Sequence, residues 1–159
     1  MQIQKGHLHH RLNPRHKAYK LSFEVMPLNT VDGNVSNIIH LAPAGTKKMV
    51  PAVLMQDGST KIQVSNIING TVVNYISDQE LPMNTYSSVI LIQQQHLDGV
   101  YRFSVYINDV KSFQVINVNP LEWDDVEVYI SSPWFDAAPV VVKDFRYQRL
   151  PESGKSCLE

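Results

Sequence analysis

The fold is decided by the alternation in Tyr19-Lys-Leu-Ser-Phe-Glu-Val25, where apolar and polar residues follow one another without a break. Side chains of a β-strand point alternately to its two faces, so a period of two predicts a strand with one buried face. No stretch of ten residues shows the period of 3.6 that an amphipathic helix requires. The segment therefore predicts one strand of a half-buried sheet.

Nine further segments read in the same way. They are residues 37–41, 52–55, 61–67, 71–76, 88–93, 100–107, 111–116, 126–130 and 140–148. Turn-forming pairs stand between several of them, and Asn108-Asp109 joins two of them as a tight hairpin. Short strands at even spacing predict an all-β fold, a two-sheet antiparallel β-sandwich of the jelly-roll type.

Length and composition narrow the class of protein. The chain has 159 residues and a mass of 18.1 kDa, which is one domain of ordinary size. Hydrophobic residues make up 43% and charged residues 18%, so the chain can bury a core. A net charge of -1 gives no general attraction for nucleic acid, and no apolar run is long enough for membrane insertion. A single cysteine, Cys157, excludes an internal disulfide.

The charges are distributed unevenly along the chain. Residues 1–20 hold five basic residues and no acid, whereas the rest hold nine basic and fifteen acidic residues. This asymmetry predicts a basic N-terminal arm over residues 1–18, a sandwich over 19–150 and a flexible tail over 151–159. The basic residues expected to bind an acidic partner surface are Lys5, Arg11, Arg15 and Lys17.

The same arm is rich in histidine. Its histidines are His7, His9, His10 and His16. Imidazoles bind zinc and copper, and they gain charge below about pH 6.5. A metal site is one interpretation of this cluster, and a linker or partner-binding extension is the other.

Several segments resemble parts of a known superfamily. Residues 19–27 look like its opening strand, and Leu81-Pro-Met-Asn-Thr-Tyr86 looks like the approach to its central strand. Residues 101–109 are similar to its hairpin, and residues 126–134 with 142–147 resemble its closing strands. The superfamily is that of the concanavalin A-like jelly rolls, which includes laminin-G, pentraxin and legume-lectin domains.

The resemblance covers about residues 19–149. It is nearest to lectin-like modules of extracellular, multidomain invertebrate proteins. It implies a secreted carbohydrate-binding or cell-adhesion module, with a glycan or glycoprotein as its partner. Because such folds carry many functions, each candidate site needs its own argument.

The loop over residues 131–138 holds the first candidate site. It places two large aromatic residues, Trp134 and Phe135, next to Asp136. Sugar rings stack on aromatic faces, and neighbouring carboxylates accept hydrogen bonds from hydroxyl groups. We therefore expect a carbohydrate site here, to which Tyr101 and Tyr106 are added from the strands. The alternative is that Trp134 closes one end of the sandwich.

An acidic stretch raises the question of enzymatic activity. Glu122-Trp-Asp-Asp-Val-Glu127 is similar to the motif of laminarinase-like glycosidases, where two glutamates roughly 5 Å apart are nucleophile and acid/base. In that reading Glu122, Asp124 and Glu127 would form the site. The apolar residues of 126–130 take the inward positions, so Glu127 should face outward. We expect a solvated acidic strand edge and no enzyme.

The resemblance also implies calcium, because laminin-G-like and pentraxin-like domains often bind it at a rim. The candidate ligands are the loop aspartates Asp32, Asp57, Asp98, Asp124 and Asp125. No contiguous calcium-binding loop is present in the sequence.

Two sequons lie in predicted turns and fit an extracellular location. They begin at Asn34 and Asn69, where an oligosaccharide would be attached. Cys157 lies in the predicted tail. It would join two chains outside the cell, or remain a free thiol.

Two functions of different classes remain. The first is a lectin-like module whose weak single sites gain avidity by repetition. The second is a structural module whose basic arm adds to a sheet edge of a neighbouring copy or domain, giving a homo-oligomer or a larger assembly.

Overall fold

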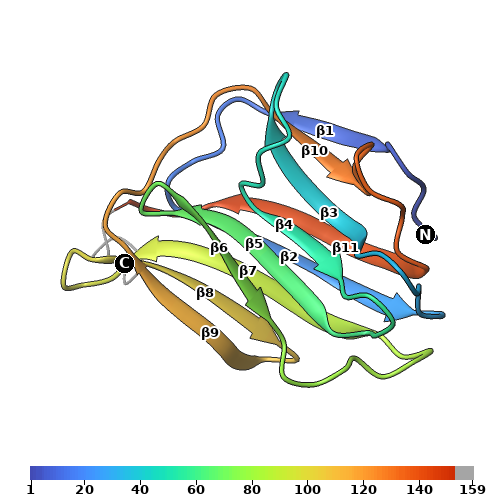
Figure 1. The fold of residues 1–159 in the computed structure, drawn as a ribbon. Helices are drawn as coiled ribbons and strands as arrows, with labels where there is room; N and C mark the ends of the chain where they lie inside the picture. Colours follow the sequence, from blue (N-terminus) through green and yellow to red (C-terminus); the bar gives the residue numbers. More distant parts are fainter. Residues whose placement is uncertain (153–159) are drawn as a thin grey trace.

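Figure 1 shows the computed structural model, which describes residues 1–152. Over this range the chain forms eleven strands and no helix, in two antiparallel sheets packed face to face. The all-β sandwich predicted from the sequence is confirmed. The part of the chain that the structure describes contains no helix that is long and apolar enough to cross a membrane.

The two sheets have six and five strands. The six-stranded sheet has the order β1 (Leu8–Leu12), β10 (Val126–Ile130), β3 (Ser36–Pro43), β4 (Ala52–Met55), β5 (Ile62–Ile68) and β6 (Thr71–Ile76). The five-stranded sheet has the order β11 (Val140–Arg149), β2 (Tyr19–Pro27), β7 (Ser87–Gln95), β8 (Tyr101–Ile107) and β9 (Val110–Asn117).

The core lies between the sheets and follows the sequence alternation. In β2 every second residue from Tyr19 to Val25 is buried, and the residues between them are partly exposed. Strand β10 alternates in the same way, with Val126 and Val128 in the core. All ten strands predicted from the sequence are present, and several carry this period of two, whereas β3 and β4 are buried along their whole length.

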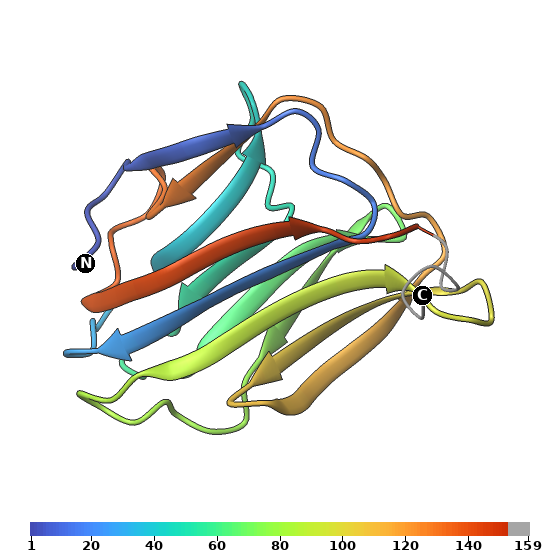
Figure 2. The same cartoon turned by 180° about the vertical axis from the view of Figure 1, so that it is seen from behind.

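The N-terminal segment differs from the prediction. Residues 8–12 form an eleventh strand, β1, that pairs antiparallel with β10 at one edge of the six-stranded sheet (Figure 2). Upstream of it, Ile3 is only 5% exposed and belongs to the core. The amino group of Met1 donates to the carbonyl of Val142 in β11, at 2.7 Å. The prediction of an arm ahead of the sandwich is therefore wrong, because this segment joins the edges of both sheets.

The basic residues of this segment bind acids of the same chain. Lys5 Nζ lies 3.5 Å from Asp136 Oδ1. Arg11 lies 3.4 Å from a carboxylate oxygen of Asp125 and 3.0 Å from one of Glu127. The charge complementarity that favours docking onto a neighbouring copy is thus satisfied within one chain. Lys17 remains exposed.

Arg15 is a core residue and not part of a docking surface. It is 2% exposed, and its two terminal nitrogens donate to the carbonyls of Val50, at 3.3 Å, and Leu121, at 2.6 Å. Its guanidinium carbon lies 4.5 Å from the centre of the Tyr19 ring, in a cation–π contact. The side chain ties the N-terminal segment to two loops.

Substitution of Arg15 by alanine should lower the free energy of unfolding by about 2–3 kcal/mol. The carbonyls of Val50 and Leu121 lose their hydrogen-bond donor, and the Tyr19 ring loses its contact with the guanidinium group. Urea denaturation followed by tryptophan fluorescence measures this loss. The exposed neighbour Lys17→Ala is the control and should change stability by less than about 0.5 kcal/mol. Equal stabilities for the two variants would contradict the structural role of Arg15.

Candidate functional site

Trp134 packs on the outer face of the six-stranded sheet. Its ring centre lies 5.1 Å from that of His40 in β3 and 5.6 Å from that of Tyr129 in β10, edge-on to both. Tyr129 and His40 are paired across the two strands, and each points away from the core because the residues beside it point inward. The half-buried indole therefore covers part of this outer face and exposes the rest of its own surface.

His40 supports the indole from below. Its Nε2 donates to the carbonyl of Lys48, at 3.1 Å, and its Nδ1 is buried without a partner among residues 1–152. Burial lowers the pKa of His40, and backbone hydrogen bonds with Lys48 and Lys47 oppose part of that shift. A neutral imidazole therefore lies under Trp134 at pH 7.

A shallow hollow opens beside Trp134. It has a volume of about 250 Å³ and is lined by Lys5, Asn34, Val35, Trp134, Phe135 and Asp136. The Lys5–Asp136 ion pair lies at its rim, and both side chains are more than half exposed. The structure thus brings Trp134, Phe135 and Asp136 together, as the sequence predicts. Trp134 lines the hollow and packs on the outer face of the sheet, so it does not close an end of the sandwich.

The two tyrosines proposed from the strands do not join this hollow. Tyr101 and Tyr106 belong to β8 in the other sheet. Tyr101 lies two residues before the buried Phe103, so both are on the inner face of the five-stranded sheet, whereas Tyr106 is on its outer face. They lie on opposite faces of one strand, and neither is on the face that carries Trp134. Including them with Trp134 in one site is wrong.

A chain of hydrogen-bonded polar side chains lies on the Trp134 face. Gln56 donates to Gln63, at 2.6 Å, and Gln63 donates to Ser65, at 3.0 Å, and to Asn74, at 3.3 Å. Ser65 also donates to Asn74, at 2.6 Å. We call these four residues the polar ladder. Gln56 and Gln63 are partly exposed and Asn74 is exposed, so their amides have further hydrogen-bonding capacity, whereas Ser65 is fully buried.

The strand register connects the ladder to the aromatic residues. His40 pairs with Ala52, Ala52 pairs with Ser65, and Ser65 pairs with Asn74, so all four lie in one row on the same face. Strands are spaced by about 4.8 Å, which places Ser65 roughly 10 Å from His40. Ala52 lies between them, and it is fully buried like His40 and Ser65, so Trp134 and Asn74 are the accessible ends of this row. Sequence reasoning missed the ladder, because its members resemble ordinary solvent-facing positions of strands.

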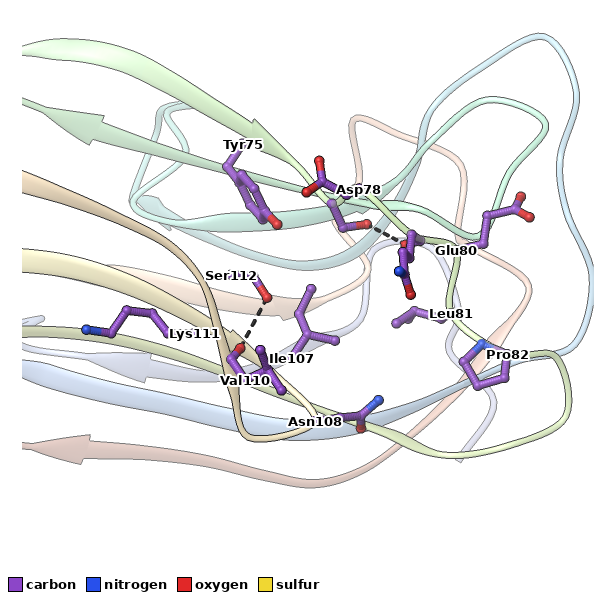
Figure 3. Close-up of a pocket in the computed structure, with 12 residues that line it drawn as sticks. Tyr75, Asp78, Glu80, Leu81, Pro82, Ile107, Asn108, Val110, Lys111 and Ser112 are labelled. Carbon is purple, nitrogen blue, oxygen red and sulfur yellow. Dashed lines mark hydrogen bonds between the residues drawn. The ribbon is translucent and has the colours of Figure 1, made fainter.

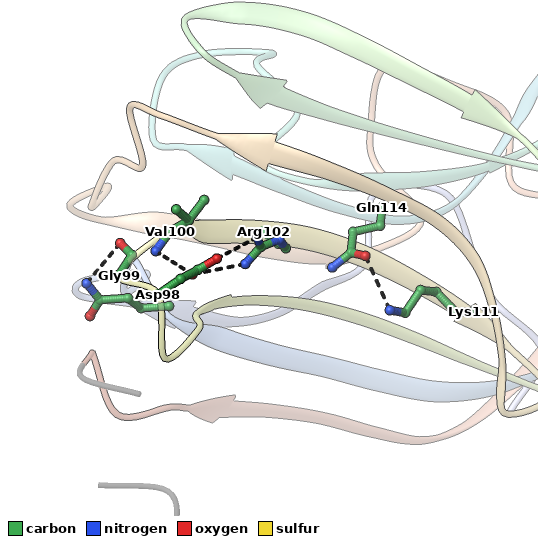
Figure 4. A network of polar contacts seen from close by, with 7 residues as sticks. Asp98, Gly99, Val100, Arg102, Lys111 and Gln114 are labelled. Atoms are coloured by element: carbon green, nitrogen blue, oxygen red, sulfur yellow. Dashed lines mark hydrogen bonds and ion pairs between the residues drawn. The ribbon is translucent and has the colours of Figure 1, made fainter. Parts of the chain in front are cut away.

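The calcium candidates are separated. Asp98 accepts two hydrogen bonds from Arg102, at 2.7 and 3.2 Å, and one from the backbone of Val100, at 3.0 Å (Figure 4). The hydrogen bond from Arg102 is the main reason why the pKa of Asp98 falls to about 2. Asp125 is bound to Arg11. Both carboxylates are thus paired with arginines.

The turns that carry Asp32 and Asp57 contact each other. Asp57 accepts a hydrogen bond from the backbone of Gly33, and Gly58 donates to the carbonyl of Val31, at 2.7 Å. Among residues 1–152, no group of three or more histidines, cysteines and carboxylates is arranged to hold a metal ion. Calcium binding stays a prediction for Asp32, Asp57, Asp98, Asp124 and Asp125.

The acidic motif does not gather its carboxylates in a cleft. Glu127 points outward from β10, as predicted, and binds Arg11 at 3.0 Å. Glu122 and Asp124 are exposed in the segment before that strand. Because β1 covers the edge of β10, the predicted acidic strand edge is not an edge of the sheet, and Glu127 instead holds β1 against β10 through Arg11.

The two sequons differ in their surroundings. Asn34 is exposed at the rim of the Trp134 hollow. The Asn69 side chain accepts from the backbone of Val118, at 2.6 Å, and donates to the carbonyl of Ile116, at 3.4 Å. Glycosylation stays a prediction that suits Asn34 better. Cys157 lies outside the described residues, as does most of the predicted tail.

A larger hollow of about 500 Å³ lies between the edge strands β6 and β9 (Figure 3). Leu81 and Ile107 contribute apolar side chains to it, and Asp78, Glu80 and Lys111 contribute charges. The sequence did not predict a site at this hollow. Tyr75 also lines it, but Phe113 stacks on that ring, with 4.9 Å between ring centres. That stacking leaves at most one ring face for a ligand.

Comparison with known proteins extends this description. No family model and no curated protein matches the sequence. A heptameric pentraxin from Limulus polyphemus superposes with a TM-score of 0.62 and 10% identity, over 95% of this chain and 76% of the pentraxin. A galectin from Caenorhabditis elegans gives 0.55 and 8%, over 94% of this chain and 95% of the galectin. The fold is a concanavalin A-like jelly roll.

A carbohydrate-bound structure also has this jelly roll. Domain 4 of an extracellular GH43 arabinanase from Geobacillus stearothermophilus, in complex with arabinotriose, superposes with a TM-score of 0.56 and 14% identity. The match covers 93% of this chain and 70% of that domain. At such identities the likeness establishes the jelly roll itself and no ligand.

Proposed function

We propose that this jelly roll is a carbohydrate-binding module and that its ligand lies across the outer face of the six-stranded sheet. The observation that carries the proposal is the placement of Trp134 and the polar ladder on one face, roughly two strand spacings apart. A hexose is roughly 5 Å long, so this distance suits two linked sugars. One would stack on Trp134 and the other would bind the ladder.

The chemistry of the face suits a neutral or weakly charged oligosaccharide. The exposed surface of Trp134 offers an apolar plane for the CH groups of a ring. The amides of Gln63 and Asn74 can donate and accept, as sugar hydroxyls require. Lys5 and Asp136 add one charge of each sign at the rim of the hollow. Such a site is shallow and wet, so repetition of the module would supply avidity and serve adhesion.

The structural comparisons support a carbohydrate-binding function through the shared fold. Galectins have this jelly roll, and so does a domain solved with arabinotriose. An extracellular location fits a glycan ligand and the exposed sequon at Asn34. The proposed assembly by a free arm has less support, since that segment binds within its own chain.

A glycan array is the test of the function. The purified domain is applied once with calcium and once with a chelator. It is produced without N-glycosylation, because a glycan on Asn34 would cover the hollow. We expect binding to a defined group of oligosaccharides. A loss of binding with the chelator would show that glycan binding requires calcium. Arrays that stay blank in both conditions would contradict the proposed function.

Removal of one member of the ladder should weaken binding. For Asn74→Ala we expect about a tenfold loss of affinity for the strongest array ligand, since its amide can no longer bind a sugar hydroxyl and the ladder loses its end. Isothermal titration calorimetry measures the change. Gln114→Ala removes an exposed amide from β9 in the other sheet and is the matched control. Equal losses in both variants would argue against the ladder.

A further inference from the structure

The histidines of the N-terminal segment are gathered at one side of the sandwich. Strands β1 and β11 are edges of the two sheets, and side chains from both meet here. The rings of His9 and His10 lie 5.2 and 6.4 Å from that of Phe145 in β11, both in edge-to-face contact. The His7 ring lies 6.4 Å from that of His9.

A β-bulge makes two consecutive histidines converge. Successive residues of a regular strand point to opposite faces, which would separate His9 from His10. The register of β1 shifts between Leu8, which pairs with Tyr129, and His10, which pairs with Val128. His9 is the extra residue, and such an insertion re-aims a side chain. As a result His9 Nδ1 and His10 Nδ1 are 2.7 Å apart and share a hydrogen bond, in which one ring donates and the other accepts.

A metal ion can replace the proton that the two nitrogens share. Neutral imidazole is the form that ligates. Arg11, the nearest cation along the strand, is already bound to two carboxylates. His9 is exposed, so an ion can reach the pair from solvent.

We propose that His9 and His10 form a chelating site for a divalent transition metal, with Cu²⁺ as the preferred ion. Two nitrogens bound at about 2.0–2.1 Å are about 2.9 Å apart at a right angle and about 3.3 Å apart at a tetrahedral angle. From the hydrogen-bonded 2.7 Å, the nitrogens need to separate less to reach the right angle of tetragonal Cu²⁺ than to reach tetrahedral Zn²⁺. Water fills the remaining positions, and the site is independent of the glycan face.

The test is a titration with Cu²⁺ followed by calorimetry and electron paramagnetic resonance. The chain carries Cys157→Ser throughout, so that no thiol binds or reduces the ion. We expect one tightly bound equivalent of Cu²⁺, with a tetragonal spectrum and hyperfine coupling to two nitrogens. His9→Gln and His10→Gln should each weaken binding at least tenfold and remove one coupled nitrogen.

The control is His96→Gln, which removes a histidine from the turn between β7 and β8. It should bind Cu²⁺ as the parent does. All variants should keep the parent melting temperature, because His9 is exposed on an edge strand. The proposal is overturned if the parent shows no coupling to two nitrogens. It is equally overturned if His9→Gln binds Cu²⁺ with the parent affinity, since the ion would then lie elsewhere.

Discussion

A chain that lacks residues 1–17 should lose most of its folding stability. The deletion removes β1, the buried Ile3 and the Arg15 contacts with Val50 and Leu121. Loss of one buried isoleucine alone costs about 2–5 kcal/mol, and the unpaired carbonyls add about 1–3 kcal/mol each. Together these losses approach the 5–15 kcal/mol that typically stabilises a domain. We therefore expect a largely unfolded protein at 25 °C.

Circular dichroism and urea denaturation measure this effect. A chain with Lys5→Ala and Lys17→Ala is the matched control, because it changes the charge of the same segment and keeps β1 and the core contacts. The control should unfold close to the midpoint of the intact chain. If the truncated chain instead matched the intact one, residues 1–17 would be a separate arm, and assembly through that arm would become the favoured function.

Replacement of Trp134 by alanine should reduce glycan affinity by roughly thirtyfold. Loss of an aromatic stacking platform in a binding site costs about 2 kcal/mol, and each 1.4 kcal/mol is a factor of ten. The strongest ligand from the array is titrated by calorimetry into both proteins. Trp134→Phe keeps a smaller ring over His40 and should retain most of the affinity.

Two controls separate binding from folding. A thermal melt of Trp134→Ala shows whether uncovering His40 unfolds the protein before affinity is compared. Tyr106→Ala removes an aromatic residue from the outer face of the other sheet and should leave affinity unchanged. If Tyr106→Ala weakened binding and Trp134→Ala did not, the ligand would lie on the five-stranded sheet and the proposed face would be wrong.

The strands could be predicted because alternation is a local property. Segments such as 19–25 and 126–130 carry the period of two within their own residues, so no partner is needed to recognise them. Strand β1 was missed because two histidines and an arginine separate its apolar residues, Leu8 and Leu12. Residues 8–12 form a strand because the backbone of β10 pairs with them and because Asp125 and Glu127 bind Arg11.

The site was predicted only where its residues are neighbours in sequence. Trp134, Phe135 and Asp136 form one loop, so their proximity needs no knowledge of the fold. Tyr101 and Tyr106 are an odd number of residues apart, and the parity of β8 alone already places them on opposite faces. The polar ladder draws on three strands, and its members meet only through the register of the sheet.

The charge pattern misled for a physical reason. Five bases without an acid at one end of the sequence indicate a separate basic segment. Net charge does not tell whether the complementary acids belong to another molecule or to the same chain. Here Asp125, Glu127 and Asp136 lie beside the segment in space although they are more than a hundred residues away in sequence.

The most direct test of the glycan face is chemical-shift mapping with the strongest array ligand and ¹⁵N-labelled protein. We expect the shifted amides and side-chain NH groups to lie in the Trp134 loop, β3, β5 and β6, including the side-chain amides of Gln63 and Asn74 and the indole NH of Trp134. Shifts confined to β7, β8 and β9, or to the hollow around Leu81 and Ile107, would contradict this account.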